Sequence, residues 1–437
     1  MASRRTVFIP YNPKTILNKS KRADHCFWTR YSAYPYIGCQ HGCEFCYCRE
    51  QKYSPYDDPN DFAHVIKVKE NAPDLLRRAL SRAPVDPVFT GDYQPAERKF
   101  GISRKMLEVC HDLGFPVFVL ERNPLVLRDL DLLKAINARS PSVVAFSIIS
   151  TPDSPNYERV CQMEHLAPPP EKRFAAMEKI AAAGLLTGTC MMPILPGLCD
   201  DDANLESVVR WTAEHGGKLI LASSMTLSDQ QRDYFFNVLR ERFPDLLGVY
   251  QRFYPPKSYA PAEYPWHKIT LKIRELCEKY GIRDRIPRPI IPSDKRAINK
   301  RIVEIFADRS YEMELEDEPG YRVWSYRKAA WAIEDLEQDV GFILLFHYLA
   351  TGVRIRSAPT GFSLPWWALQ PVEAFLTSNP GLPKSRKIRK SQKKKQATSF
   401  PDSSYNYDCT VRSTFHHQDT KAQRLLIMKL RDLVTSC

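Results

Sequence analysis

The chain has 437 residues, of which 43% are hydrophobic, and it carries a formal net charge of +12 with a pI near 9.0. A chain of this length and composition can bury a sizeable core, which excludes a wholly disordered protein. The longest apolar stretch, around 341–353, is interrupted by His347 and is too short to cross a bilayer, so no membrane span is expected. The basic balance favours a polyanionic partner such as DNA or RNA over a small substrate.

The N-terminal segment and the cysteines indicate a soluble, cytoplasmic protein. Residues 1–12 carry Arg4 and Arg5 but no continuous apolar core, so they do not have the pattern of a secretory signal. Twelve cysteines in such a chain are better explained as metal ligands and buried thiols than as disulfides, because cytosolic thiols are kept reduced.

Short apolar runs alternate with amphipathic stretches from residue 30 to residue 227, a pattern typical of βα units around a parallel sheet. The expected strands are Tyr34–Cys39, Pro87–Asp92, Pro116–Arg122, Ser142–Ser150, Leu186–Leu195 and Lys218–Met225. The expected helices are Arg104–Leu113, Leu127–Ile136, Glu171–Ala183 and Ala203–His215, with Gly114, Gly184 and Gly216 as helix stops. Six such repeats are too few for a closed eight-stranded barrel, so the sequence predicts an α/β chain with an open, partial (β/α)6 barrel.

The pattern changes after the last expected strand. We expect residues 228–308 to close the lower edge of the barrel, and the segment 285–292 to form an exposed loop because it is rich in proline and arginine. A helix is predicted over Tyr321–Val340. Beyond it the periodicity is lost and eight of the twelve residues from Lys384 to Lys395 are basic, so we expect 371–420 to be disordered.

These observations divide the chain into four parts. We expect an N-terminal arm at 1–29, the barrel at 30–310, a small helical C-terminal extension at 311–345 and an irregular basic tail at 346–437.

Three cysteines follow the first expected strand in the sequence Cys39-Gln-His-Gly-Cys43-Glu-Phe-Cys46. Three thiolates on one loop can bind three irons of a [4Fe–4S] cluster and leave the fourth iron open to a chelating cofactor. The alternative is a zinc site completed by Cys48. Because Cys46 and Cys48 are only two residues apart, their side chains would point in opposing directions in an extended chain, so the spacing favours the cluster.

The Cys-x3-Cys-x2-Cys loop, with Phe45 before its last cysteine, resembles the signature of the radical S-adenosylmethionine (SAM) superfamily. The resemblance implies that SAM chelates the open iron and that an electron from the cluster cleaves SAM to a 5′-deoxyadenosyl radical. That radical removes a hydrogen atom from the substrate. An external electron donor, such as a flavodoxin or a ferredoxin, is implied as well.

Three further segments, Thr90–Glu97, Arg128–Leu133 and Pro193–Gly197, resemble the DNA repair photolyases related to spore photoproduct lyase. The similarity covers about 31–309 and implies a lyase that repairs damaged bases in DNA. An enzyme of this kind must draw the base out of the stack to reach it. The alternatives are a radical SAM enzyme that modifies RNA or a peptide, and a non-catalytic iron–sulfur protein that binds DNA.

The same resemblance implies roles for individual residues. Phe45 would lie against the adenine of SAM, Gly91 and Asp92 at its amino group, Arg122 near its carboxylate and Ser147 at its ribose, although ordinary packing or capping roles are the alternative for each.

Spore photoproduct lyase uses a cysteine near the end of strand two as a hydrogen donor, and this chain has Thr90-Gly91-Asp92 there, which places identical chemistry in doubt. The remaining candidate donors are Cys161, Cys190 and Tyr93.

The stretch from Tyr326 to Leu336 resembles the helix that opens the helix-hairpin-helix DNA-binding domain of family X DNA polymerases. If so, it is a second DNA contact. The glycine-containing hairpin expected next is not recognisable after Val340, so an amphipathic helix that packs on the barrel is the alternative.

Overall fold

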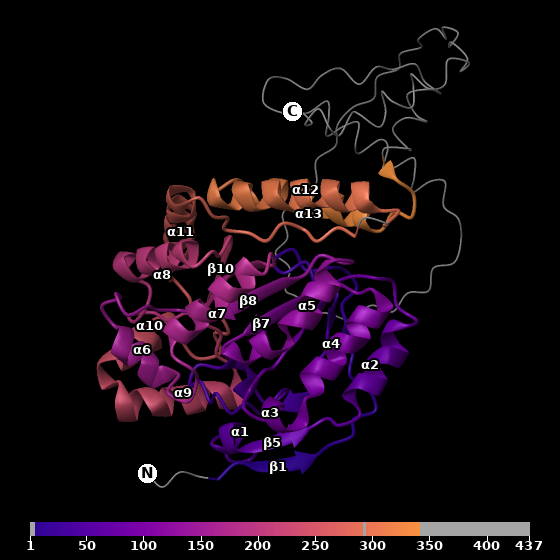
Figure 1. The fold of residues 1–437 in the computed structure, drawn as a ribbon. Helices are drawn as coiled ribbons and strands as arrows, with labels where there is room; N and C mark the ends of the chain where they lie inside the picture. Colours follow the sequence, from indigo (N-terminus) through magenta and orange to yellow (C-terminus); the bar gives the residue numbers. More distant parts are fainter. Residues whose placement is uncertain (1–4, 292–293, 341–437) are drawn as a thin grey trace, which may run out of the picture. The chain divides into compact units, whose positions relative to one another are not determined.

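The computed structural model describes residues 5–291 and 294–340. A seven-stranded sheet lies at its centre, in the order β10-β9-β8-β7-β6-β3-β2 (Figure 1). Six strands run parallel to their neighbours and β2 (Asn18–Lys19) is antiparallel to β3. The parallel strands are β3 (Tyr31–Ser32), β6 (Val88–Gly91), β7 (Val117–Glu121), β8 (Val143–Ser147), β9 (Leu186–Ile194) and β10 (Leu219–Ser224). The predicted partial (β/α)6 architecture is thereby confirmed.

The first expected strand is wrong in position. The strand that pairs with β6 is the two-residue β3, whereas β4 (Tyr36–Ile37) belongs to a second sheet in the order β1-β5-β4, with β1 (Val7–Pro10) and β5 (Val65–Val68). Pro35 lies between β3 and β4, and proline has no N–H group to donate to a continuing ladder. The cysteine loop therefore follows a strand of the small sheet rather than a strand of the central sheet.

Helices cover the outer face of the central sheet. Leu107, Leu133 and Ile180 of these helices are buried in one core with Val119 and Val144 of the sheet. The covering helices are α2 (Ala72–Leu80), α4 (Ile102–Leu113), α5 (Leu130–Asn137), α7 (Pro170–Ala182) and α8 (Asp202–Glu214). Shorter elements are η1 (Tyr47–Arg49), α1 (Asp61–His64), α3 (Glu97–Phe100), η2 (Pro124–Asp129) and α6 (Tyr157–Met163). Gly114, Gly184 and Gly216 have positive φ just beyond the helices, as expected of helix stops.

Residues after β10 are helical. The helices are α9 (Asp229–Arg242), η3 (Pro244–Leu246), α10 (Leu247–Phe253), α11 (Trp266–Tyr280), α12 (Ala297–Leu315) and α13 (Gly320–Glu334). The predicted last helix is correct in type but stops at Glu334, six residues early. Figure 1 shows α12 and α13 side by side at one end of the sheet and β1 with β5 at the other.

The expected exposed loop at 285–292 is partly buried over 285–291, the part of it that the structure describes. Ile286 is 2% exposed and Arg288 is 4% exposed. Arg288 is held inside because its guanidinium lies 4.9 Å from the ring centroid of Trp28 and forms an ion pair with Glu334. The indole Nε1 of Trp28 donates to the carbonyl oxygen of Ile286 at 2.9 Å, so this segment is fastened to the N-terminal arm.

The expectations for the tail 346–437, including the disorder at 371–420 and the basic run Lys384–Lys395, lie outside the described residues. Within 5–291 and 294–340, no helix has the length and apolarity that a membrane span requires.

Candidate iron–sulfur and SAM site

The cysteine loop is a tight turn held by its own backbone. The amide of Cys39 donates to the carbonyl oxygen of Phe62 at 2.8 Å, Gly42 donates to Cys39 at 3.0 Å and Cys46 donates to Cys43 at 3.3 Å. Gly42 has a φ of 58°, and a Cβ atom there would lie 2.9 Å from Cδ1 of Leu166. The left-handed backbone conformation therefore favours glycine at this position, and any side chain would also require Leu166 to move.

Arg49 fastens the loop from behind. Its Nε donates to the carbonyl oxygen of Cys43 at 3.0 Å and its Nη2 donates to that of Gly42 at 2.9 Å. The guanidinium also lies 4.0 Å from the ring centroid of Tyr234 and 4.6 Å from that of Phe62. These contacts fix the backbone between two of the thiols, so the loop is preorganised.

Glu44, between the cysteines, anchors the loop to helix α9. Its buried carboxylate accepts hydrogen bonds from the hydroxyl of Tyr234 and, at 2.5 Å, from Nη1 of Arg242. Both partners lie on α9. Glu44 is thus explained by attachment of the loop to the rest of the chain.

The three thiols lie within electrostatic reach of one another. Burial raises the pKa of Cys43 to about 11 and that of Cys39 well above its ordinary value, and neighbouring thiols add to both shifts. A hydrogen bond with Cys48 lowers the pKa of Cys46 to about 7. Three soft sulfur donors on one preorganised loop fit an iron–sulfur cluster, whose irons stabilise the thiolate form that burial alone disfavours.

Single-ion metal sites follow a different geometry. Among the described residues, no three His, Cys, Asp or Glu side chains gather tightly enough around one point to hold a metal ion. A cube-shaped cluster takes its thiolates at separate corners, so this finding concerns single ions and not the cluster.

His41 lies beside the first cysteine. Its Nδ1 is 3.6 Å from Sγ of Cys39, and its Nε2 is 3.3 Å from the side-chain nitrogen of Asn123. Burial lowers the pKa of His41 to about 3, so the ring is neutral.

Gly91 and Asp92 form the end of β6, next to a buried carboxylate. The amides of Asp92 and Tyr93 both donate to Oε1 of Glu121, which is 4% exposed. A Cβ atom on Gly91 would lie 2.4 Å from that same oxygen, so no other residue fits there without a shift of Glu121. Burial raises the pKa of Asp92 to about 7.

Gln94 links the end of β6 to the cysteine loop. Its Nε2 donates at 3.0 Å both to Asp92 Oδ1 and to the carbonyl oxygen of Gly38, and its Oε1 accepts from the amide of Gln40 at 2.9 Å. Sequence analysis did not assign this residue a role. Its position could have revealed it, because Gln94 is a polar residue within the Thr90–Glu97 segment, just after the end of β6.

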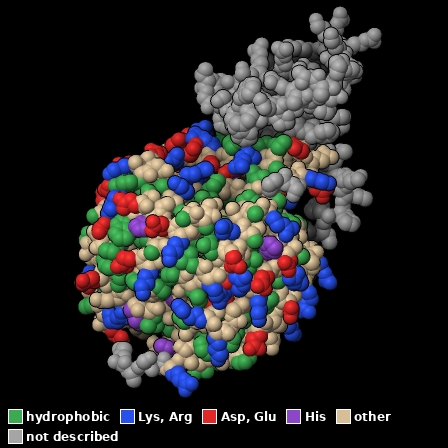
Figure 2. Space-filling view, in the orientation of Figure 1, with side chains coloured by type: hydrophobic (Ala, Val, Ile, Leu, Met, Phe, Trp, Pro, Cys, Tyr) green, Lys and Arg blue, Asp and Glu red, His purple; other side chains and the backbone are tan. Residues whose placement is uncertain are grey.

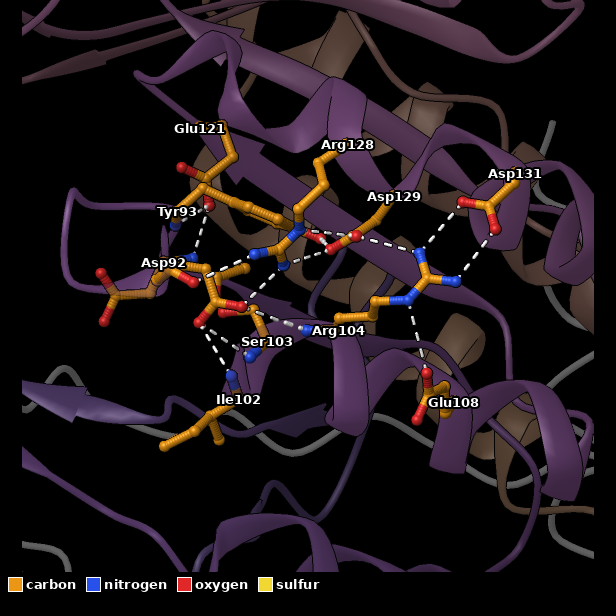
Figure 3. Close-up of polar contacts among 12 residues, drawn as sticks. Asp92, Tyr93, Ile102, Ser103, Arg104, Glu108, Glu121, Arg128, Asp129 and Asp131 are labelled. Atoms are coloured by element: carbon orange, nitrogen blue, oxygen red, sulfur yellow. Dashed lines mark hydrogen bonds and ion pairs between the residues drawn. The ribbon is translucent and has the colours of Figure 1, made fainter. Parts of the chain in front are cut away.

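The Thr90–Glu97 and Arg128–Leu133 segments contact each other in a polar network (Figure 3). The hydroxyl of Tyr93 donates to Asp129 Oδ2 at 2.9 Å, and Nη2 of Arg128 donates to Oε1 of the buried Glu97 at 2.7 Å. Arg104 bridges Asp129 and Asp131. Tyr93 is fully buried in the core shared with the covering helices, so its geometry is that of a scaffold residue.

Three other expected site residues lie together on the inner face of the sheet. Ser147 of β8 pairs with Cys190 of β9, and residues paired on adjacent parallel strands face the same side. Glu121 of β7 pairs with Phe146 of β8, so the next residues along the two strands, Arg122 and Ser147, lie opposite each other. The guanidinium of Arg122 lies 5.3 Å from the ring centroid of Phe45 and pairs with Glu164.

Glu164 and Arg173 complete this arrangement and were missed by sequence analysis. Nη2 of the fully buried Arg173 is 2.7 Å from Oε1 of Glu164, and its Nη1 donates to the carbonyl oxygen of Ser147 at 2.9 Å. Cys161 lies apart on α6, where Tyr157 is its hydrogen-bonding partner. The inner face thus gathers Phe45, Arg122, Ser147 and Cys190, whereas Cys161 and Tyr93 are elsewhere.

Comparisons with known proteins found a family model, relatives and solved structures that are similar to this chain. Residues 34–206 match the model of the Radical SAM superfamily. An uncharacterised protein of Mycobacterium tuberculosis is 28% identical over 284 residues, which span 63% of this chain and 82% of that protein. An uncharacterised protein of Methanocaldococcus jannaschii is 28% identical over 173 residues, 39% of this chain and 62% of that protein. Two variants of spore photoproduct lyase match with TM-scores of 0.47 and 0.48 at 16% and 15% identity, each over 63% of this chain and 81% of theirs.

Proposed function

Residues 34–206 of this chain are a radical SAM domain, and on that premise we propose that the protein is a radical SAM lyase that repairs damaged bases in DNA. Radical SAM proteins use a [4Fe–4S] cluster and SAM, and they need an external electron donor. The observation that carries the proposal is the polar network of Figure 3. It joins two segments that resemble DNA repair photolyases, and Gln94 connects that network to the cysteine loop.

The chain offers a residue for each part of the two cofactors. Cys39, Cys43 and Cys46 would hold the cluster. When bound, the cluster and SAM supply one-electron chemistry that ends in abstraction of a hydrogen atom from the substrate. The residues proposed to hold SAM are Asp92 and Gly91 at its amino group, Arg122 at its carboxylate, Ser147 at its ribose and Phe45 at its adenine.

Asp92 and Arg122 would orient the amino acid part of SAM. The carboxylate of Asp92 is held by Gln94, and its φ of 76° turns it out of the strand direction. An ammonium group beside Asp92 would favour its ionised form and offset the cost of burial. Arg122 is held by Glu164 and can direct a second guanidinium edge at a carboxylate.

Cys190 is our proposed hydrogen donor among the three candidates. Its thiol is buried on the inner face in the row with Ser147, and burial raises its pKa well above the ordinary value, so it keeps its hydrogen. Cys161 lies on helix α6 rather than on the sheet, and the hydroxyl of Tyr93 is bonded to Asp129.

The charge of the chain supports a nucleic acid as partner. Most of the excess of basic over acidic residues lies beyond residue 340, outside the described residues. On the face in Figure 2, Lys and Arg are interspersed with Asp and Glu. Attraction to phosphates is therefore assigned mainly to the C-terminal tail, and recognition of the lesion to the barrel.

The test is anaerobic turnover with ultraviolet-treated and untreated DNA. Full-length protein with a reconstituted cluster is reduced in the presence of SAM, with flavodoxin or ferredoxin as donor, and 5′-deoxyadenosine and loss of the lesion are quantified. Cys43→Ala should lose the cluster absorbance and the nucleoside, whereas Cys48→Ala should keep both.

Each alternative gives a different result. A cluster that yields no 5′-deoxyadenosine would favour a non-catalytic iron–sulfur protein. Nucleoside formation without any change in DNA would redirect the search to RNA or a peptide. Loss of metal in Cys48→Ala, with zinc in the native protein, would refute the cluster itself.

A further inference from the structure

A cavity of about 600 Å³ lies beside β10, the edge strand of the central sheet. Its walls come from β10, from residues 21–26 of the N-terminal arm and from helices α11, α12 and α13. All of these belong to one compact unit that extends to Glu334. The volume is within the range of small-ligand sites, which is about 300–1,000 Å³.

The β10 wall of the cavity is two strands away from Ser147 of the proposed SAM site. Leu221 lines the cavity and pairs with Cys190, which in turn pairs with Ser147. These three side chains therefore lie in one row on the inner face of the sheet. Cys26 also lines the cavity, and it lies within electrostatic reach of Cys190. A ligand in the cavity could thus extend toward the residues assigned to SAM.

The outer part of the cavity is lined by aromatic rings with cations over them. Trp324 and Trp331 lie on the same side of α13, with ring centroids 5.9 Å apart and ring planes inclined at 65°, so the edge of one faces the other. Arg22 lies 5.0 Å from the centroid of Trp331, and Arg327 lies 5.4 Å from that of Trp324. Trp324 is 39% exposed, so part of its ring is open to a ligand.

Of the acidic residues that line the cavity, Glu314 and Asp24 are engaged within the protein, whereas Oδ2 of Asp284 has no hydrogen-bond partner among the described residues. Oε2 of Glu314 is 2.7 Å from Nη2 of Arg327. Oδ1 of Asp24 accepts the amides of Cys26 and Phe27 at 2.7 and 3.1 Å. Lys21 and Arg22 at the same wall add positive charge. Planar rings beside cations suit a flat ring that carries a phosphate, because bases stack on aromatic side chains and phosphates attract cations.

We propose that this cavity receives a single base drawn out of a DNA strand, stacked on the partly exposed ring of Trp324 and in edge contact with Trp331, with its flanking phosphates beside Lys21 and Arg22. The inference rests on the proposed function and names where its substrate enters. An extruded base in this position would lie beside β10, the edge strand next to the strand that carries Cys190.

The experiment measures binding without turnover. Full-length, cluster-loaded protein is mixed with SAM and a single-stranded DNA oligonucleotide that contains one 2-aminopurine, and no reductant is added. Anisotropy gives the Kd, and quenching of 2-aminopurine reports stacking. Trp324→Ala and Trp331→Ala should each raise the Kd roughly 5- to 100-fold and reduce the quenching, the range expected for loss of one base–aromatic stack.

Tyr321→Ala is the matched control. Tyr321 lies on the same helix, is 75% exposed and is not part of the cavity wall, so its removal should leave both signals unchanged. An oligonucleotide with an abasic residue at the probe position should bind the native protein and the two tryptophan variants equally. Iron content and circular dichroism of each variant verify folding.

Equal Kd and equal quenching in the native protein and both tryptophan variants would overturn the inference, and would leave the proposed function intact if lesion repair persists. Absence of DNA binding by the native protein, with 5′-deoxyadenosine still formed, would instead remove the DNA substrate and the inference with it. Tighter binding of an RNA oligonucleotide of the same sequence would overturn the assignment to DNA.

Discussion

The side-chain nitrogen of Asn123 lies 3.3 Å from Nε2 of His41. An amide NH2 group can only donate, so Nε2 is the acceptor and the ring proton is on Nδ1. Nδ1 is 3.6 Å from Sγ of Cys39, where it can donate to the sulfur. Asn123 thereby selects the histidine tautomer that stabilises negative charge on a cluster ligand.

We predict that His41→Phe lowers the reduction potential of the bound cluster. An N–H to sulfur hydrogen bond favours the reduced, more negative cluster, so its loss should shift the potential down by on the order of tens of millivolts. Asn123→Leu should act in the same direction with a smaller effect, since the ring remains but its tautomer is no longer selected. The measurement is a redox titration followed by electron paramagnetic resonance.

Equal potentials in the native protein and both variants would show that His41 only fills space. Asn123→Asp is a useful companion variant, because a carboxylate accepts and would draw the proton to Nε2. If the tautomer matters, this variant should resemble His41→Phe.

Asp92 has a raised pKa that makes the apo protein less stable in alkali. Burial raises that pKa from 3.8 to about 7. The unfolded chain therefore releases this proton at lower pH than the folded chain, and the stabilising contribution is lost as pH rises from about 4 to above 7. Asp92→Asn should raise the free energy of unfolding by about 2 kcal/mol at pH 8 and change it little at pH 4.

The same substitution should weaken SAM binding, since an amide cannot pair with the ammonium group of the ligand. Denaturant unfolding at the two pH values and calorimetric titration with SAM check the two effects separately. An Asp92→Asn variant that is less stable at pH 8 would contradict the pKa argument, and one with native SAM affinity would remove Asp92 from the proposed site.

Much of the fold could be predicted because buried parallel strands are continuous apolar runs. Observed β6, β7, β8, β9 and β10 all fall inside the predicted strand ranges. The prediction of the first strand failed because the two residues of β3 are too few to produce a hydrophobic pattern, and the apolar residues Tyr34, Tyr36 and Ile37 suggested a strand farther along the chain.

The site was predictable only where its residues are neighbours in sequence. The cysteine loop is local, whereas Asn123 and His41 are 82 positions apart and meet only where the loop after β4 of the small sheet contacts the end of β7 of the central sheet. The cavity could not be predicted from the sequence, because its walls come from segments that are far apart along the chain, namely the N-terminal arm, β10 and α13. Cys26 was therefore assigned no role, although it lies close to Cys190.

Arg288 and Glu334 form a bidentate ion pair with both N–O distances at 2.6 Å. Arg288 is 4% exposed, and the pair connects the segment after β10 to the end of α13. Removal of one partner leaves a buried charge, so Glu334→Leu or Arg288→Met should cost about 3 kcal/mol of unfolding free energy. Denaturant unfolding measures this cost.

The double variant should be more stable than either single variant, because no charge is then left buried alone. Glu318→Ala is the matched control on the surface, where its pair with Arg322 is partly exposed and worth below about 1 kcal/mol. A double variant as unstable as the sum of the singles would indicate that the two residues act independently.

The basic run Lys384–Lys395 should add affinity for DNA without selecting a sequence or a lesion. Each lysine that neutralises a phosphate contributes about 0.7 to the slope of log K against log salt for single strands. Replacement of Lys393, Lys394 and Lys395 by glutamine should therefore reduce the slope by about 2 and weaken binding at low salt. The quenching of 2-aminopurine at saturation should not change, since stacking is assigned to Trp324 and Trp331 in the cavity. A variant that loses the quenching but keeps its salt slope would reverse the two assignments and place base recognition in the tail.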